Sequence, residues 1–569
     1  MKKTTIIVIT IITIFLLGSK INFGCTNFLI TKGASVDGST MISYAADSHV
    51  LYGELYIRPA ADYPDGAMLE VYEWDTGKFL KKIKQVKHTY SVVGNMNEHQ
   101  VAIGETTYGG RHELVDTLAL MDYGSLMYIA LQRAKTAREA MKVMTELAAE
   151  HGFCSHGESF SISDPNEVWI MEMIGKGVGN TGAVWVARLV PDGYVCAHAN
   201  QARITTFSFS EKNNWDDINQ TTYHSADVIS FARKMEYFKG KDEDFSFSDT
   251  YAPVDFGGAR FCEIRVWAMF NVVNKDMGKY WEYAKGHVTH DEINGYANNR
   301  MPLWIKPDKK VSVSDMMNFM RDHLENTELD MRNDIGAGPF QLPYRWRGLT
   351  WKVDSIAYCN ERATATQQTG FSFVTQSRSW LPDPIGGIFW FSVDDAASSV
   401  YVPMYCGITK SPESYAEGNG SMLEYSSTSA FWAFNFVSNF AYLRYSDMIK
   451  DVIKVRNELE NKFIENTSNV DKKAEELYKN DKASAIKYLT DYSSEQGNNT
   501  VKRWQELGQY LLVKYIDGNI KKEKDGKFET NGYTNIPAYP YQLGYPEWWY
   551  KKIIEETGDR FKVIESEEH

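Results

Sequence analysis

The 569-residue sequence predicts an α+β fold in which two antiparallel sheets are sandwiched between layers of helices. Short runs rich in aromatic and β-branched residues form two blocks, at 159–200 and 371–406. Stretches in which apolar residues recur at helical spacing flank both blocks. Because no internal repeat or low-complexity linker divides the chain, we expect one large domain at 25–420 and a helical C-terminal region at 421–569.

The first 24 residues have the composition of a secretory signal peptide. Two early lysines are followed by an apolar run at 6–17, then by polar residues and by Gly24. The run is shorter than the roughly 20 apolar residues that cross a bilayer. We therefore expect residues 1–24 to be removed, the protein to be exported by a bacterial cell to the periplasm or medium, and the mature chain to begin at Cys25.

A cysteine at the start of a chain can act as nucleophile and base together. The nucleophilic form of Cys25 is the thiolate, which requires a base to accept the thiol proton. An α-amine has an ordinary pKa of about 7.7–8.0 and is therefore partly neutral near pH 7. The sequence thus predicts an N-terminal nucleophile that needs no histidine.

Residues 28–30 and 41–44 are expected to form a hairpin, because Asp37-Gly38-Ser39 between them is typical turn sequence. This hairpin would return Asp47 to the chain start, where its carboxylate could hold the α-amine of Cys25. An aspartate at a strand end is also a common turn cap, so both interpretations remain open at this stage.

The first helical block covers 118–149 and contains a capping box that starts at Thr136. An antiparallel meander follows, and Asn200 closes its last strand. A side-chain amide donates hydrogen bonds without charge, which suits an oxyanion, although such an Asn can also bond its own backbone. The predicted strands of this meander are 159–163, 168–173, 183–190 and 194–200.

Beyond the meander, residues 205–255 are interpreted as an insertion with helix. Arg260 and Arg265 come next, and either guanidinium could clamp a substrate carboxylate or form a structural ion pair. A helix is expected at 315–324, and the second strand block ends near 406. After residue 421 the chain turns helical, and the aromatic tail at 533–550 is expected to pack on the body.

The composition excludes several classes of function. A net charge of −13 without a basic block argues against a nucleic-acid partner, and no stretch after the leader is long and apolar enough to span a membrane. Six cysteines are too few for a disulfide framework in an exported chain of this length. Monomer and homo-oligomer both remain open.

Motifs distributed from Cys25 to about residue 456 resemble a known family, the cysteine N-terminal-nucleophile (Ntn) dipeptidases, a broad-specificity bacterial group related to secernins. No single motif is decisive, but the order and spacing of the motifs together are specific to this family. The matching segments are Cys-Thr-Asn at 25–27, Met-Asn-Glu at 96–98, Glu-Thr-Thr at 105–107, Ala-Arg-Glu-Ala at 137–140, Trp-Val-Ala-Arg at 185–188, Ala-Asn-Gln-Ala-Arg-Ile at 199–204, Arg-Ser-Trp-Leu-Pro at 378–382 and Ser-Ala-Phe-Trp at 429–432.

The resemblance implies an αββα Ntn-hydrolase fold and hydrolysis of the amide bond of dipeptides, with no metal or cofactor. It implies that Cys25 is the nucleophile, that Asp47 supports the amine and that Asn200 contributes to an oxyanion hole. Relatives usually carry an arginine three residues before that aspartate, whereas this chain has Tyr44. The expected substrate-binding residues are Thr107, Arg260 and Arg265.

Three alternatives remain. Related cysteine enzymes cleave penicillin or conjugated bile acids, so an acyl-amide substrate is open. A leader that ends at a cysteine also describes a lipoprotein, whose lipidated Cys25 would lose both nucleophile and base. His151, Cys154, His156 and Glu158 could be assembled into a metal site, but their spacing matches no standard zinc pattern.

Overall fold

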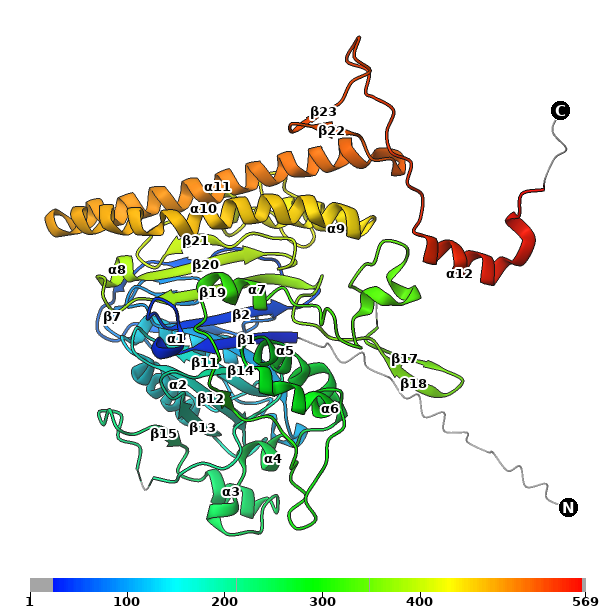
Figure 1. The fold of residues 1–569 in the computed structure, drawn as a ribbon. Helices are drawn as coiled ribbons and strands as arrows, with labels where there is room; N and C mark the ends of the chain where they lie inside the picture. Colours follow the sequence, from blue (N-terminus) through cyan, green and yellow to red (C-terminus); the bar gives the residue numbers. More distant parts are fainter. Residues whose placement is uncertain (1–23, 211, 347, 565–569) are drawn as a thin grey trace, which may run out of the picture.

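The computed structural model describes residues 24–564 except 211 and 347, and the predicted signal peptide at 1–23 lies outside this range. Two antiparallel sheets are stacked at the centre, and helices lie on both outer sides of the stack (Figure 1). The predicted α+β sandwich is therefore confirmed.

The seven-stranded sheet joins the start of the chain to its second half. Its central strands β2 and β19 pair through register contacts such as Ala46 with Phe371, so the predicted N-terminal hairpin and the second strand block share one sheet. Its strands, in spatial order, are β16 (Trp304–Ile305), β14 (Val195–His198), β1 (Gly24–Ile30), β2 (Met41–Asp47), β19 (Thr369–Ser377), β20 (Gly387–Val393) and β21 (Val402–Tyr405).

The eight-stranded sheet contains the predicted meander, with one correction. The last predicted strand, 194–200, is β14, which leaves the meander and pairs with β1 of the other sheet, for example Asn27 with His198. The strands, in spatial order, are β15 (Thr222–His224), β13 (Ala183–Leu189), β12 (Val168–Gly175), β11 (Gly157–Ser163), β10 (Ala102–Gly109), β9 (Met96–Asn97), β8 (Val92–Val93) and β3 (Ile57–Arg58).

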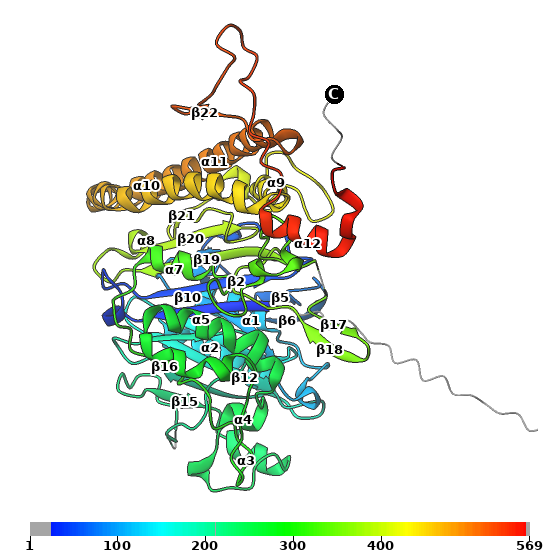
Figure 2. The same ribbon diagram turned by 45° about the vertical axis from the view of Figure 1, so that its right-hand side comes forward.

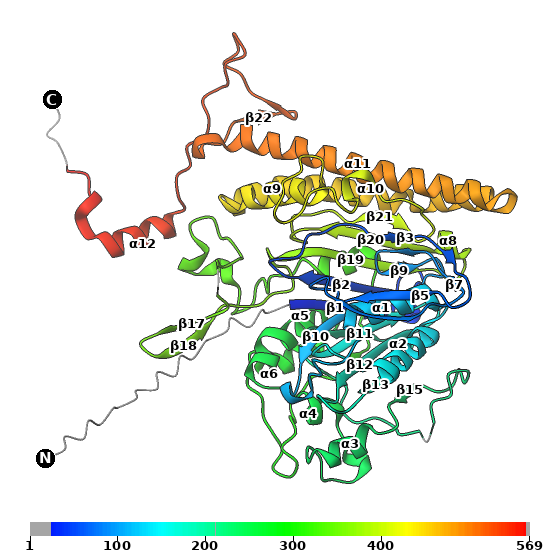
Figure 3. The same cartoon turned by 180° about the vertical axis from the view of Figure 1, so that it is seen from behind.

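Helices α1 (Tyr123–Arg133) and α2 (Ala137–His151) cover the outer face of the eight-stranded sheet (Figure 3). Both helices begin at side-chain caps. Asp122 accepts from the Ser125 N–H, and Thr136 accepts from the Glu139 N–H. The second half of the predicted capping box differs, because Glu139 Oε2 accepts from the Lys135 N–H and not from that of Thr136. Their buried apolar side chains pack with those of β10 to β13 in a core separate from the one between the sheets.

Helices also cover the seven-stranded sheet. α5 (Ile264–Val273) lies against β1 and β14, and α7 (Val313–Phe319) lies against β19. The long helices α10 (Tyr445–Asn480) and α11 (Lys482–Tyr515), with α9 (Ala430–Tyr442), cover the β20–β21 end (Figure 2). Residues of α9 to α11 belong to the same buried cluster as the sheet residues, and the predicted boundary at 420 stays a prediction.

The remaining elements are short. Helices α3 (Val228–Lys234), α4 (Phe247–Tyr251), α6 (Trp281–Ala284) and α8 (Asp383–Gly386) decorate the sandwich, and α12 (Glu547–Thr557) lies near the C-terminal end. Four two-stranded sheets are also present in the described residues: β4 (Ala61–Asp62) with β7 (His88–Thr89), β5 (Met68–Tyr72) with β6 (Phe79–Lys84), β17 (Thr350–Val353) with β18 (Ile356–Cys359), and β22 (Glu523–Lys524) with β23 (Lys527–Phe528).

The expected packing of the aromatic tail on the body is wrong for most of its length. Tyr533 is 94% exposed and Tyr539 is 73% exposed. α12 has no buried residue and stands away from the sheets (Figures 1 and 3). Prolines at 537, 540 and 546 interrupt regular structure in this segment. Tyr545 is an exception, because its ring contacts Phe340 of the body. In the described range, no helix is both long and apolar enough to span a membrane.

Candidate active site

The side chain of Cys25 points into the space between the two sheets. Side chains alternate along β1, so that Thr26 faces the helical side and reaches Arg265 of α5, whereas Asn27 reaches Ser161 of the opposite sheet. Cys25 shares the side of Asn27 and is 5% exposed. The strand therefore buries the thiol at the end of the sandwich where β1 begins.

Two polar side chains lie beside the sulfur. Cys25 Sγ is 3.6 Å from Glu105 Oε1 and 3.8 Å from the Tyr44 hydroxyl, which itself donates to Glu105 Oε1 at 2.6 Å. Burial raises the pKa of the Cys25 thiol well above its usual value, and the charges of Glu105 and Asp47 raise it further. The thiol is therefore the favoured form until a base takes its proton.

The main-chain nitrogen of Cys25 is held by Asn200. Cys25 N donates to Asn200 Oδ1 at 2.9 Å, and Asn200 Nδ2 donates to the Thr107 carbonyl at 2.7 Å. Asn200 lies just after β14, which ends at His198. Its φ is +59°, a left-handed conformation that asparagine tolerates better than most residues. The predicted oxyanion amide thus lies at the nucleophile, with its carbonyl oxygen toward the nitrogen of Cys25.

Arg265 holds the main chain around this site. Its Nη1 donates to the Cys25 carbonyl at 2.5 Å and to Thr26 Oγ1 at 2.7 Å. Its Nη2 donates to Asn200 Oδ1 at 2.8 Å and to the Ala199 carbonyl at 3.2 Å, and its Nε donates to the Phe261 carbonyl at 2.9 Å. Burial and the neighbouring Arg362 lower the pKa of Arg265 to about 10. All five N–H groups of Arg265 are bound to oxygen atoms of the protein itself. Arg265 therefore orients Cys25 and Asn200, and its predicted role in substrate binding stays a prediction.

Asp47 returns to the chain start, as the hairpin predicts, since it lies opposite Gly24 in the β1–β2 register. Its carboxylate accepts from Arg362 Nη2 at 2.5 Å and from Thr369 Oγ1 at 2.6 Å. Arg362 Nη2 also donates to the Gly24 carbonyl at 3.0 Å. A Cβ on Gly24 would lie 2.3 Å from Arg362 Nη2, so this approach requires glycine.

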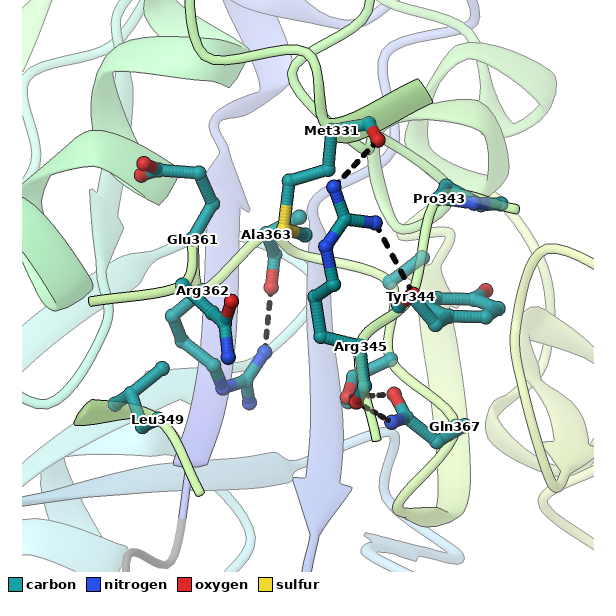
Figure 4. A pocket seen from close by; sticks show the side chains of 12 residues that line it. Met331, Pro343, Tyr344, Arg345, Leu349, Glu361, Arg362, Ala363 and Gln367 are labelled. Carbon is teal, nitrogen blue, oxygen red and sulfur yellow. Dashed lines mark hydrogen bonds between the residues drawn. The ribbon is translucent and has the colours of Figure 1, made fainter. Parts of the chain in front are cut away.

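Figure 4 shows the segment that carries Arg362. Glu361 and Arg362 point away from each other, and the loop around them is held by Arg345, which donates to the Met331 carbonyl and accepts from Gln367 Nε2. Glu361 forms an ion pair with Arg260. The guanidinium of Arg260 is thereby engaged away from Cys25, and its predicted role in substrate binding stays a prediction.

A cavity of about 1070 Å³ opens beside this cluster. Its polar wall next to Cys25 is formed by Gly24, Thr107, Asn200, Arg265 and Arg362. The far side is formed by main chain and by mixed side chains, including Arg111, His112, His156, Asp255 and Phe261. Such a concave site with a few convergent polar groups is typical of small-molecule binding.

Sequence reasoning did not identify Glu105 or Arg362 as site residues, and it considered Glu158 only as a ligand of the alternative metal site. Glu105 and Glu158 are both buried acids in strands of otherwise apolar, small or hydroxyl side chains, which is the one signal that could have found them. Arg362 has no such signal. For the alternative metal site, the described residues contain no group of three or more His, Cys, Asp or Glu side chains that could hold an ion.

The sequence was next compared with known protein families and with individual proteins. The model of Peptidase family C69 matches residues 24–458. A probable dipeptidase B of Streptococcus pyogenes serotype M1 is 21% identical over 541 residues, which cover 92% of this chain and 97% of that protein.

Two further relatives match a shorter part. A probable dipeptidase of Salmonella dublin is 23% identical over 69% of this chain and 83% of its own length, and dipeptidase A of Lactobacillus helveticus is 22% identical over 69% and 77%. The family match begins at Gly24, directly before the buried cysteine, and extends through both sheets into α10. The chain therefore belongs to peptidase family C69.

Proposed function

We propose that the protein is a cysteine-type dipeptidase whose nucleophile is Cys25, made N-terminal by removal of residues 1–24. The observation that carries this proposal is the bond from Cys25 N to Asn200 Oδ1, which fixes the nitrogen of the nucleophile itself. The names of the relatives, dipeptidase A, B and probable dipeptidase, support the substrate class.

The reaction begins with proton transfer from the Cys25 thiol to its own α-amine. Sulfur then attacks the scissile carbonyl carbon, and the ammonium protonates the departing amine of the C-terminal residue. Water hydrolyses the resulting thioester with the α-amine again as base. One N–H of Asn200 is bound to the Thr107 carbonyl, and its second N–H is the donor for the oxyanion.

The position of Gly24 supports this sequence of events. Gly24 lines the cavity, and cleavage after it would place the new α-amine of Cys25 at the cavity wall. Asn200 Oδ1 would then hold an amine instead of a peptide nitrogen. Arg265 donates to the carbonyl of Cys25 and to Asn200 Oδ1. These bonds would keep the α-amine and thiol of Cys25 aligned with the side-chain amide of Asn200.

We also propose that the enzyme acts outside the cytoplasm, because the leader at 1–24 has the composition of an export signal. Small peptides would then be hydrolysed in the periplasm or medium. N-terminal peptide mass of protein recovered from that fraction tests the start at Cys25. A diacylglyceryl or N-acyl group on Cys25 would contradict the proposal and favour a lipid-anchored binding protein.

The catalytic test compares three forms of the mature enzyme on a panel of dipeptides. Cys25→Ala should abolish hydrolysis, and Cys359→Ala, in a surface hairpin outside the cavity lining, should retain it. A form with Gly24 still attached should be inactive although its thiol is intact, because it lacks the α-amine. Activity of that form would rule out the amine as base. Cleavage of penicillin or bile-acid amides without dipeptide hydrolysis would favour the acyl-amide alternative.

A further inference from the structure

Two buried glutamates face each other next to the nucleophile. Glu105 of β10 lies diagonally across the strand pair from Glu158 of β11, because Glu105 is opposite Phe160 and Thr107 is opposite Glu158. Each is 1% exposed, and each carboxyl acts on the pKa of the other. Two ionised carboxylates that share a buried site repel each other strongly, which favours the state in which one of them keeps its proton. We therefore take the pair to hold one proton.

The remaining contacts of the pair agree with a shared proton. Glu158 Oε1 accepts from Thr107 Oγ1 at 2.8 Å, and Glu105 Oε1 accepts from the Tyr44 hydroxyl at 2.6 Å. The other two oxygens, Glu105 Oε2 and Glu158 Oε2, are buried and receive no donor from any other side chain in the described part of the chain. A proton between them satisfies both.

The charged and titratable groups around Glu105 come from several elements. Cys25 on β1, Tyr44 on β2 and Glu158 on β11 act on it, together with Asp75 between β5 and β6. Burial raises the pKa of Glu105 to about 7, and burial together with Glu105 raises that of Glu158 well above its usual value. Tyr123 of α1 also interacts with Glu105.

We propose that Tyr44, Glu105 and Glu158 form a second catalytic group of the Cys25 site, in which the shared proton keeps Glu105 neutral and the Tyr44 hydroxyl donates to the Cys25 thiolate. The inference rests on the proposed role of Cys25. The thiol proton goes to the α-amine, and the tyrosine keeps its own proton. Only its hydrogen bond turns, from Glu105 Oε1 toward Sγ, and it turns back when the sulfur becomes acylated.

The geometry explains why the carboxyl must be neutral. An ionised Glu105 would place a full negative charge 3.6 Å from Sγ in a dry interior, where it opposes both the thiolate and the oxyanion. It would also hold the Tyr44 hydrogen more strongly. Arg265 acts on Cys25 from the other side, but its N–H groups are already bound to main-chain and neutral side-chain oxygens.

The test measures the ionisation of the Cys25 thiol directly in the mature enzyme. The rate of alkylation by iodoacetamide is followed from pH 5 to 10, and the modified Cys25 peptide is quantified by mass. Glu105→Gln should match the wild type below pH 7, where Glu105 is neutral. Above pH 7, where the ionised Glu105 of the wild type raises the thiol pKa, the variant should alkylate about tenfold faster, since one pKa unit is a tenfold change. Tyr44→Phe should shift the thiol pKa the other way and slow alkylation about tenfold.

Matched controls separate this effect from a general loss of buried polar groups. Tyr401→Phe removes a buried hydroxyl bound to Ser372, and Glu172→Gln removes a buried carboxyl whose pKa is also raised to about 7. Neither residue contacts Cys25, and both controls should leave its alkylation profile unchanged. Tyr44→Phe retains the ring contacts with Phe371 and Phe373, so it carries the test alone if Glu105→Gln does not fold.

Wild-type alkylation profiles in the folded variants, or an accelerated Tyr44→Phe, would overturn the inference. These outcomes differ from a failure of the proposed function, which would appear as dipeptide hydrolysis by Cys25→Ala. The pH profile of kcat/KM gives a second readout. In the wild type, kcat/KM should fall as the pH rises through the pKa of Glu105, because the ionised carboxylate opposes the thiolate. This fall should disappear in Glu105→Gln and persist in both controls.

Discussion

Arg362 and Asp47 form a buried ion pair directly beside the Gly24–Cys25 peptide bond, with 2.5 Å between Nη2 and the carboxylate and side-chain exposures of 6% and 0%. The pair connects the strand that carries the nucleophile to a loop more than 300 residues away. Because the same Nη2 also donates to the Gly24 carbonyl, the ion pair anchors the first residue of β1.

Removal of either partner should be strongly destabilising. Arg362→Ala leaves a buried carboxylate without its cation, a loss that typically costs about 3–5 kcal/mol of unfolding free energy. Asp47→Asn should cost a similar amount, and the double variant should lose less than the sum of the two. Urea unfolding measures these values, and strict additivity would show that the two residues act independently.

Substitutions of Asn200 should separate catalysis from backbone strain. Both Asn200→Gly and Asn200→Ala lose the hydrogen bonds of the amide, but glycine fits φ +59°, so Asn200→Gly should lower the melting temperature less than Asn200→Ala. Both remove the amide and should reduce kcat about 100- to 1000-fold, the typical effect of losing one oxyanion donor. Wild-type kcat in Asn200→Gly would exclude a catalytic role for the amide.

His198 should make the protein sensitive to acid. Burial and the neighbouring Arg203 lower the pKa of this histidine from 6.5 to about 3. Its ring contacts Thr106 Oγ1 and Ser161 Oγ, both at 2.7 Å. Because the folded pKa is depressed, the unfolded chain takes up a proton first as the pH falls below 6.5. The stabilisation by neutral His198 is therefore lost over this range, by up to about 1.4 kcal/mol per pH unit.

Buried carboxyls with raised pKa values oppose this trend, so the comparison must be made against a variant. His198→Gln keeps a neutral polar side chain that does not titrate. The unfolding free energy of the wild type minus that of the variant should decrease between pH 6.5 and 5. A difference that is constant with pH would mean that the pKa of His198 is the same in the folded and the unfolded protein.

Arg260 should contribute to stability more than to substrate binding. Its Nε donates to Glu361 Oε2 at 2.9 Å, and its Nη1 donates to the Lys285 carbonyl at 3.1 Å. Arg260→Ala and Glu361→Ala should each lower the unfolding free energy by about 1.5–3 kcal/mol, the range for hydrogen bonds to charged groups. KM for dipeptides should stay within twofold. A tenfold rise in KM for Arg260→Ala alone would place this residue in the substrate site.

The sequence predicted individual strands and helix starts well, because these depend on residues that are close together in the chain. The run at 159–163 is part of β11, 168–173 is part of β12, and the Thr136 side chain caps the start of α2. The helix expected at 315–324 is shorter and begins two residues earlier, as α7, because Ser312 and Asp315 form a reciprocal cap.

Long-range pairing could not be predicted in this way. Whether the strand at 194–200 pairs with β13 or with β1 depends on which sheet edge is open, a property that appears only when the whole sandwich is assembled. Arg362 reaches Asp47 because β19 follows it and pairs with β2. Asn200 and Asp47 were found because a strand end and a hairpin return are local signals.

The close approach of Arg362 to Gly24 has a practical meaning for anyone who expresses this enzyme. A tag that leaves alanine, serine or methionine directly before Cys25 would press a side chain against the guanidinium and disturb the Asp47 pair as well. Under the proposed mechanism, such a preparation would be damaged at two points, the blocked amine and the displaced arginine, and its inactivity would be misread as absence of an enzyme. Recombinant material should therefore be designed so that a protease or the host removes everything before Cys25.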